Sequence, residues 1–158
     1  MVDEICLNDA LLEGTKEVFE TMIFMDLKEA TGPMQTNGDD FFLGSITFKG
    51  NLEGCLAICC NSQCAQTVAH NMLGIDPGDN LTEDDISDAV GEVTNMVMGS
   101  VKSRILDFVG NLDVSIPMVI RGKKLDNSLG ENANKISKTI NIEDEHSAVL
   151  SLLYREKL

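Results

Sequence analysis

The residues of this sequence best suited to chemistry are the carboxylates and the amide of the segment Asp88-Ala-Val-Gly-Glu92-Val-Thr-Asn95. Glu92 and Asn95 are three positions apart, so their side chains would be neighbours on the surface of a helix. A carboxamide holds a donor and an acceptor and stays neutral, so Asn95 could orient a water molecule without becoming protonated. The sequence contains no Ser-His-Asp set or phosphate-binding glycine loop that would suggest other chemistry.

A helix is expected to position these residues, because apolar side chains recur around them at about 100° per residue. The predicted buried stripe comprises Ile86, Val90, Val93, Val97 and Val101, with Phe108 in line further on. With that stripe against the core, the predicted solvent side carries Asp88, Glu92, Asn95, Gly91 and Gly99.

The two glycines on the predicted solvent side need a reason, since each costs a helix roughly 1 kcal/mol relative to alanine. An exposed glycine has no core to pack against, so Gly91 and Gly99 suggest that another backbone comes close to the helix. The alternative is an ordinary solvated face on which the two glycines have no role. The spacing by itself leaves both interpretations open.

A pattern that extends beyond this segment allows it to be compared with a known family. Asp-x-x-x-Glu-x-x-Asn with Pro117 downstream resembles the signature of the CheC/CheX/FliY family of chemotaxis phosphatases, with CheX the most similar member. The resemblance covers nearly the whole chain, although the interval from Asn95 to Pro117 is one residue shorter than the family pattern. Further similar segments are Val18–Met22, Gly50–Gly54, Asn71–Gly74 and Asp113–Ile120.

The resemblance implies an activity and roles for the residues. Such a protein would dephosphorylate the aspartyl phosphate of a CheY-like response regulator, with Asn95 orienting the attacking water. Glu92 would engage the active-site lysine of the receiver, and Asp88 would lie beside the contact. Gly91 and Gly99 would leave room for the partner, and Pro117 would support the motif. A non-catalytic adaptor that binds a phosphorylated receiver is the alternative.

The resemblance also implies partners and a fold. The chain would need no cofactor of its own, because the receiver supplies Mg²⁺, and it would form a homodimer through sheet edges. The expected fold is α+β, a largely antiparallel sheet packed with helices, in a single domain spanning residues 1–158. Strands in adjacent runs along the sequence independently favour an antiparallel sheet.

Composition limits the function classes. The chain has 158 residues and a formal net charge of −14, which disfavours nucleic acid and anionic membrane surfaces as partners. It has no apolar run of about 18 residues or more, so no membrane span is predicted. The start, Met1–Asn8, lacks the basic region of a signal peptide, and a cytoplasmic location is expected.

The five cysteines are Cys6, Cys55, Cys59, Cys60 and Cys64. In the cytosol they are expected to be reduced thiols in the core, with Cys55 and Cys59 on one face of a strand and Cys60 on the other. A metal site built from Cys60, Cys64 and His70 is an alternative, but its spacing fits no common zinc pattern.

The other elements follow from periodicity and turn residues. A first helix is predicted over about residues 9–30, capped by Asn8 or Asp9 and stopped by Thr31-Gly32-Pro33. Thr82, with Asp85 in a capping box, should begin the motif helix, which should run to about Phe108 and end at Gly110. The remaining predictions are strands 41–49 and 52–60 joined at Gly50-Asn51, helix 62–73, strand 114–120 at an edge or bulge, polar loop 127–134, and strands around 136–142 and 148–152.

The first predicted helix contains Asp9-Ala-Leu-Leu-Glu13-Gly-Thr-Lys16, which repeats the Asp-x-x-x-Glu spacing but has lysine at the asparagine position. Lysine only donates hydrogen bonds and is cationic, so Lys16 could not replace the amide. We interpret the repeated spacing as a coincidence, and in either case one site is expected, on the Glu92–Asn95 helix.

Overall fold

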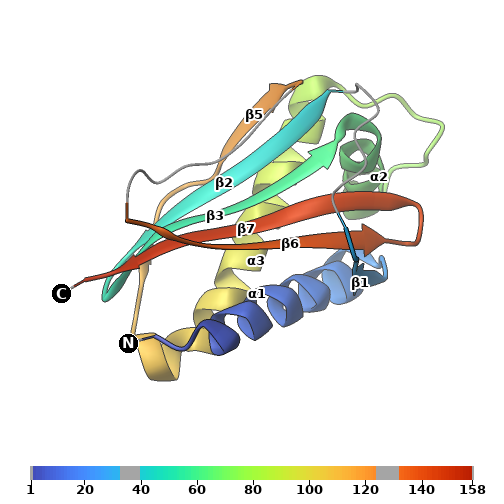
Figure 1. Cartoon of the computed structure of the whole chain (residues 1–158). Helices are drawn as coiled ribbons and strands as arrows, with labels where there is room; N and C mark the ends of the chain where they lie inside the picture. Colours follow the sequence, from blue (N-terminus) through green and yellow to red (C-terminus); the bar gives the residue numbers. More distant parts are fainter. Residues whose placement is uncertain (1, 33–39, 124–131, 158) are drawn as a thin grey trace.

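The computed structural model describes residues 2–32, 40–123 and 132–157. Three helices gather on one side of a seven-stranded sheet (Figure 1) in which every strand pair is antiparallel. The elements are α1 (Glu4–Val18), a π-helical turn (Phe19–Ile23), β1 (Leu27–Glu29), β2 (Phe41–Lys49), β3 (Leu52–Asn61), α2 (Ser62–Leu73), α3 (Glu83–Val109), β4 (Asp113–Val114), β5 (Met118–Gly122), β6 (Asn134–Ile142) and β7 (His146–Glu156). The predicted α+β class with a largely antiparallel sheet is confirmed.

The sheet has the order β1-β6-β7-β3-β2-β4, and β5 also pairs with β2. The hairpin β2–β3 turns at Gly50 and Asn51, as the sequence predicts. The predicted strand 114–120 is interrupted at residues 115–117, so β4 and β5 form a broken edge beside β2. The proline at position 117 lies in that gap, where a missing backbone donor disturbs no ladder.

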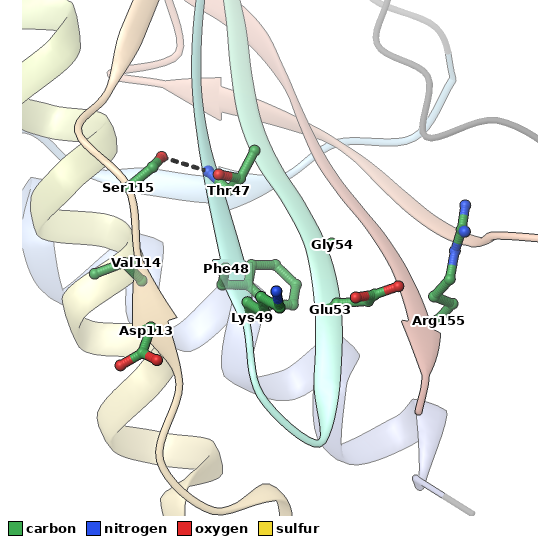
Figure 2. Close-up of a pocket in the computed structure, with 9 residues that line it drawn as sticks. All are labelled: Thr47, Phe48, Lys49, Glu53, Gly54, Asp113, Val114, Ser115 and Arg155. Atoms are coloured by element: carbon green, nitrogen blue, oxygen red, sulfur yellow. Dashed lines mark hydrogen bonds between the residues drawn. The ribbon is translucent and has the colours of Figure 1, made fainter. Parts of the chain in front are cut away.

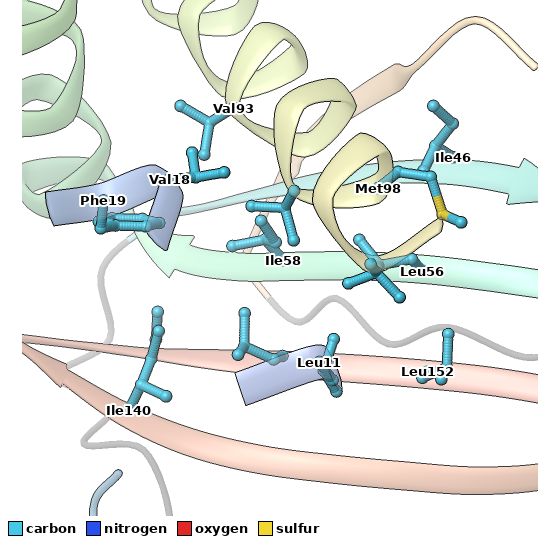
Figure 3. Packing of buried hydrophobic residues seen from close by; sticks show 14 of the residues in the cluster. Leu11, Val18, Phe19, Ile46, Leu56, Ile58, Val93, Met98, Ile140 and Leu152 are labelled. Carbon is cyan, nitrogen blue, oxygen red and sulfur yellow. The ribbon is translucent and has the colours of Figure 1, made fainter. Parts of the chain in front are cut away.

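The main core lies between the helices and the sheet. Figure 3 shows Val93 and Met98 of α3 with Ile46 of β2 and with Leu56 and Ile58 of β3. A smaller apolar cluster lies on the other face of the sheet and contains Phe41, Leu43, Ala57 and Cys59. Both faces of β2 and β3 therefore bury apolar side chains.

The first helix differs from its prediction. Asp3, not Asn8 or Asp9, caps α1, and its side chain accepts a hydrogen bond from the Ile5 amide. The helix changes into the π-turn and ends at Phe24, which adopts left-handed backbone angles (φ 61°, ψ 40°). Residues Leu27–Glu29 then pair with β6 as β1, so the predicted helical end near residue 30 is wrong. Pro33, the third residue of the predicted stop, is outside the described residues.

The predictions for the buried face of α3 and for the polar loop 127–134 have different outcomes. The buried stripe of α3 is confirmed at all five valine and isoleucine positions, but Phe108 is 46% exposed. Ile105 and Val109 are buried in its place, because the far half of α3 packs against α1 and the buried face rotates around the helix. Most of the predicted polar loop 127–134 is outside the described residues.

Candidate functional site

The start of α3 is fixed by its own residues. The Thr82 hydroxyl accepts from the Asp85 amide at 3.1 Å, and the Asp85 carboxylate accepts from the Thr82 amide at 3.1 Å. This capping box confirms the predicted helix start. Arg121 of β5 then binds Glu83 in the first turn, with Nη1 2.6 Å from Oε2, and also binds Asp40. The edge strand and the helix are thereby joined at this end.

The motif turn of α3 lies directly over strand β2 because Gly44 has no side chain. A Cβ built at Gly44 would collide with Thr94 Oγ1 and lie 3.0 Å from Val90 Cγ1. The Thr94 hydroxyl is fully buried and donates to the Val90 carbonyl at 2.7 Å, so its approach leaves no unpaired donor. Gly44 was not predicted as a site residue from the sequence, although a glycine inside a strand is a known signal of close backbone approach.

The prediction that Gly91 faces solvent is wrong. It is buried, and a Cβ there would lie 3.4 Å from Val119 Cγ2 and 3.7 Å from Pro117 Cγ. Val119 is itself the β5 partner of Gly44. The edge strand therefore packs onto α3 at Gly91, so the protein's own strand covers this glycine where a partner's backbone was expected.

The remaining motif residues lie where the sequence places them. Asp88, Glu92, Asn95 and Gly99 are all exposed, on the side of α3 opposite its buried valines. A Cβ built at Gly99 would meet nothing within 4 Å, so the surface around it is open. The structure thus brings Glu92 and Asn95 together on an outer face of α3. Gly91 is buried beside this face, in contact with Pro117.

Glu92 and Asn95 are free to bind a visiting molecule. Neither side chain makes a hydrogen bond or an ion pair with any residue in the described part of the chain. The segment Glu83–Asn95 contains five carboxylates and no lysine or arginine. Glu83 is paired with Arg121, and the negative charge of the others attracts cations. A neutral amide beside a carboxylate on a rigid helix can hold a water molecule and a cationic side chain at the same time.

A hollow in the surface lies away from the motif residues and is lined by side chains of both charges. It measures about 550 Å³ and is found at the β2–β3 hairpin end, beside β4 (Figure 2). Lys49 and Arg155 line it together with the carboxylates of Glu53 and Asp113. No motif residue lines it. The exposed face of α3 with Asp88, Glu92, Asn95 and Gly99, here called the ridge, suits a macromolecular partner better than an enclosed small ligand.

The cysteines are free thiols, and four of the five are buried, with Cys6 exposed. The predicted strand faces are confirmed, since Cys59 belongs to the outer cluster and Cys60 to the main core. A hydrogen bond with Cys64 and then burial raise the pKa of the Cys60 thiol well above its usual range, which keeps it protonated and a poor metal ligand. Across residues 2–32, 40–123 and 132–157, no group of three His, Cys, Asp or Glu side chains could hold a metal ion.

Known proteins resemble this chain in sequence and in fold. The family model described as "Chemotaxis phosphatase CheX" matches residues 42–141, which include β2 except Phe41, and the whole of β3, α2 and α3. The chain belongs to the CheX family. No curated protein matches the sequence. Among the helices in the described residues of this chain, none has the length and apolar character needed to span a membrane.

Solved structures agree with the assignment to CheX. The chemotaxis protein CheX from Vibrio vulnificus is 26% identical, with a TM-score of 0.77 over 94% of this chain and 96% of the other. A CheC-like superfamily protein from Shewanella sp. PV-4 is 24% identical, with a TM-score of 0.80 over 97% and 99%. The CheX–CheY–BeF3–Mg²⁺ complex from Borrelia burgdorferi shares the fold at 15% identity, with a TM-score of 0.72 over 99% and 100%.

Proposed function

We propose that this protein hydrolyses the aspartyl phosphate of a CheY-like response regulator by placing α3 in the receiver's active site. The observation that carries the proposal is the shared outward face of Glu92 and Asn95, both exposed and without partners among the described residues. The chain offers no nucleophile–base pair at this face, so the substrate must already be reactive. An acyl phosphate meets that condition, because its hydrolysis depends mainly on positioning and electrostatics.

Each residue has one role in the proposed reaction. The Asn95 amide orients a water molecule in line with the phosphorus, and the water oxygen forms a bond to phosphorus as the bond to the aspartate oxygen breaks. The water's protons pass to the released phosphate and to solvent, and the receiver's carboxylate is regenerated. Glu92 binds the receiver's active-site lysine and fixes the register of the helix, while Asp88 borders the contact.

The metal in this scheme belongs to the partner. In the Borrelia complex, CheX is found with CheY, BeF3 and Mg²⁺, which supports a receiver as the partner of the related ridge here. Mg²⁺ on the receiver would neutralise charge on the phosphoryl oxygens. The chain itself then needs only to supply the amide, the carboxylate and the open surface at Gly99.

In this proposal Gly99 keeps the role expected from the sequence, and Gly91 does not. Gly99 is open to solvent and leaves room for the receiver's loops. Gly91 acts indirectly, since Pro117 and Val119 of the edge strand pack over it at the motif turn. A cytoplasmic homodimer joined through sheet edges remains part of the proposal, because the short β1 and the broken β4–β5 edge both lie at sheet ends.

The experiment is a phosphate-release assay on a panel of phosphorylated receivers encoded by the same genome. Catalytic amounts of the protein should shorten the phosphate half-life of the cognate receiver. Asn95→Ala should lower this turnover by about 100- to 1,000-fold while largely sparing binding, because the side chain is exposed and has no structural partner among the described residues. An unchanged rate in Asn95→Ala removes the assignment of Asn95.

The same assay tests the adaptor alternative. An adaptor would bind the phosphorylated receiver but leave its phosphate half-life unchanged at catalytic amounts. Any effect of an adaptor would need stoichiometric protein, since protection or exposure of the phosphate requires continued occupancy. Turnover at a small fraction of the receiver concentration therefore separates the two functions.

A further inference from the structure

Four charged side chains form a row across the sheet at the β2–β3 hairpin end. They are Asp113 of β4, Lys49 of β2, Glu53 of β3 and Arg155 of β7, and all of them line the hollow shown in Figure 2. In backbone register Lys49 is opposite Asp113, and Glu53 is opposite Arg155. The hairpin register, extended by one pair toward the turn, places Lys49 opposite Glu53. The signs of this charge row therefore alternate from strand to strand, as negative, positive, negative and positive.

The charge row lies on the face of the sheet away from the helices. Phe48 and Tyr154, each next in sequence to a member of the row, belong to the main core, and successive residues of a strand point to opposite faces. In Figure 2 the helices accordingly lie behind the strands that carry the row. Two members of the row are exposed and two are half-buried, so the row is open to another molecule.

The opposite charges of the row leave attraction available to a partner. Among the described residues, the side chains of Lys49, Glu53 and Asp113 make no hydrogen bond or ion pair, although they are neighbours across the strands. They surround a hollow of about 550 Å³. A facing surface that presents the opposite sign at each position would gain from all of them.

The order of the charges makes the row complementary to itself. A two-fold axis at right angles to the row, passing between β2 and β3, reverses the row in a second copy of the chain. Asp113 then faces Arg155 of the second copy, and Lys49 faces Glu53 of the second copy, so every facing pair has opposite charges. The commonest homo-oligomers are built by such two-fold contacts, in which each copy uses the same surface.

The charge of the whole chain also favours this surface for a second copy. With a formal net charge of −14, two copies repel each other in most orientations. The charge row is locally neutral, because it has two basic and two acidic residues, and it lets two copies approach with less repulsion. Its length, three strand spacings or about 14 Å, lies within a standard interface of about 800 Å² per partner.

We propose that the charge row is a contact between two copies of this chain, in which each facing pair forms twice. The row crosses the strands, whereas the sheet-edge contact of the proposed function runs along one strand, so the two contacts are distinct. Exposed ion pairs each contribute little affinity and mainly fix orientation. The contact is therefore expected to be reversible and to depend on protein concentration.

The test is sedimentation velocity of the full chain over a range of concentrations, without a receiver. Lys49→Glu and Glu53→Lys each place like charges opposite each other twice in the contact, so each should weaken self-association at least about tenfold. An equimolar mixture of the two variants has opposite charges at every facing position and should recover the association of the wild type. Lys102→Glu makes the same change of charge on α3, on the other side of the sheet, and should leave association unchanged.

The outcomes are independent of the proposed phosphatase, since neither receiver nor phosphate is present. Loss in each single variant with recovery in the mixture supports the contact. A mixture that stays as weak as its components overturns it, and so does equal weakening by Lys102→Glu. A wild type that is monomeric at every concentration also overturns it. A dimer that forms equally well in the wild type and in all variants assigns self-association to the sheet edges, whose backbone groups none of the substitutions changes, and overturns the charge row.

Discussion

Helices α1 and α3 lie on the same face of the sheet and contain matching segments, Asp9–Lys16 and Asp88–Asn95. The two segments agree at the aspartate, alanine, glutamate and threonine positions. The match includes buried structure, because Thr15 donates to the Leu11 carbonyl at 2.6 Å as Thr94 does to Val90 at 2.7 Å. Both threonines are fully buried.

The similarity continues in the topology. After each helix comes an edge strand and then a long hairpin, β1 with β2–β3 and β4–β5 with β6–β7. Each edge strand pairs with the first hairpin strand of the opposite half, β1 with β6 and β5 with β2. This correspondence argues against the coincidence we inferred from the sequence and indicates an internal repeat.

The difference between the halves lies in what faces outward. Where α3 has Asn95, α1 has Lys16; where α3 has Gly91 beneath the edge strand, α1 has the half-buried Leu12. The shared alanine and threonine are buried in both helices, and the shared aspartate and glutamate are exposed in both. The residue that differs on the outer face, Lys16 or Asn95, decides whether that face can hold a water molecule. The packing framework is therefore common to both halves, and the proposed chemistry belongs to only one.

The largest effect should come from giving α3 the residue of α1. Asn95→Lys replaces a neutral amide with a cation that cannot accept a hydrogen bond, so turnover should fall at least about 100-fold. The melting temperature should not change, since Asn95 is exposed. Asn95→Gln, which keeps the amide on a longer stem, serves as the control and should retain part of the activity. Phosphate release that survives the lysine would contradict the difference we draw between the halves.

A smaller effect is expected when the charge at Glu92 is removed. Glu92→Gln keeps the size of the side chain but loses the charge-assisted bond to the receiver's lysine, so receiver affinity should fall roughly tenfold. The loss should shrink as salt is added. Glu13→Gln, the equivalent change on the exposed face of α1, is the matched control and should leave affinity unchanged. Equal effects of the two variants would show that general charge, not position, matters.

Local signals were enough to predict α2, α3 and the β2–β3 hairpin. Asn61 and Gly74 bound α2, Thr82 and Gly110 bound α3, and all four act through their own turn of backbone. The end of α1 could not be predicted in this way, because the chain turns at Phe24 without a glycine or a proline. There the pairing of β1 with β6, a contact between distant parts of the sequence, sets the boundary.

In the site, too, the features set by local sequence could be predicted and those set by distant contacts could not. Helical period placed Glu92, Asn95 and Gly99 outward from sequence, because those residues face only solvent in the described structure. The period failed for Gly91, since a helical wheel contains no information about an edge strand arriving from residues 117–119.

The two glycines of α3 now predict different outcomes for the same substitution. Gly99→Ala places a methyl group in open space and should stabilise the fold by about 0.5–1 kcal/mol through helix propensity. It should also weaken receiver binding, because the methyl occupies the proposed contact. Gly91→Ala, whose methyl would lie in ordinary contact with Val119, should leave receiver binding unchanged. Thermal unfolding and receiver titration measure both effects, and unaltered binding by Gly99→Ala would remove Gly99 from the contact.

The smallest effect should follow from giving α1 the residue of α3. Lys16→Asn restores the amide to the repeated segment, yet in an Asn95→Ala background it should not restore phosphate release. Lys16 is half-buried in the last turn of α1, so an amide there is less open than Asn95. The change should cost stability of only about 0.3–1 kcal/mol, from the lost interaction of a cation with the helix end. Recovery of turnover would mean that the repeated segment is sufficient for the reaction, and that the open ridge and the edge strand beside α3 are not required.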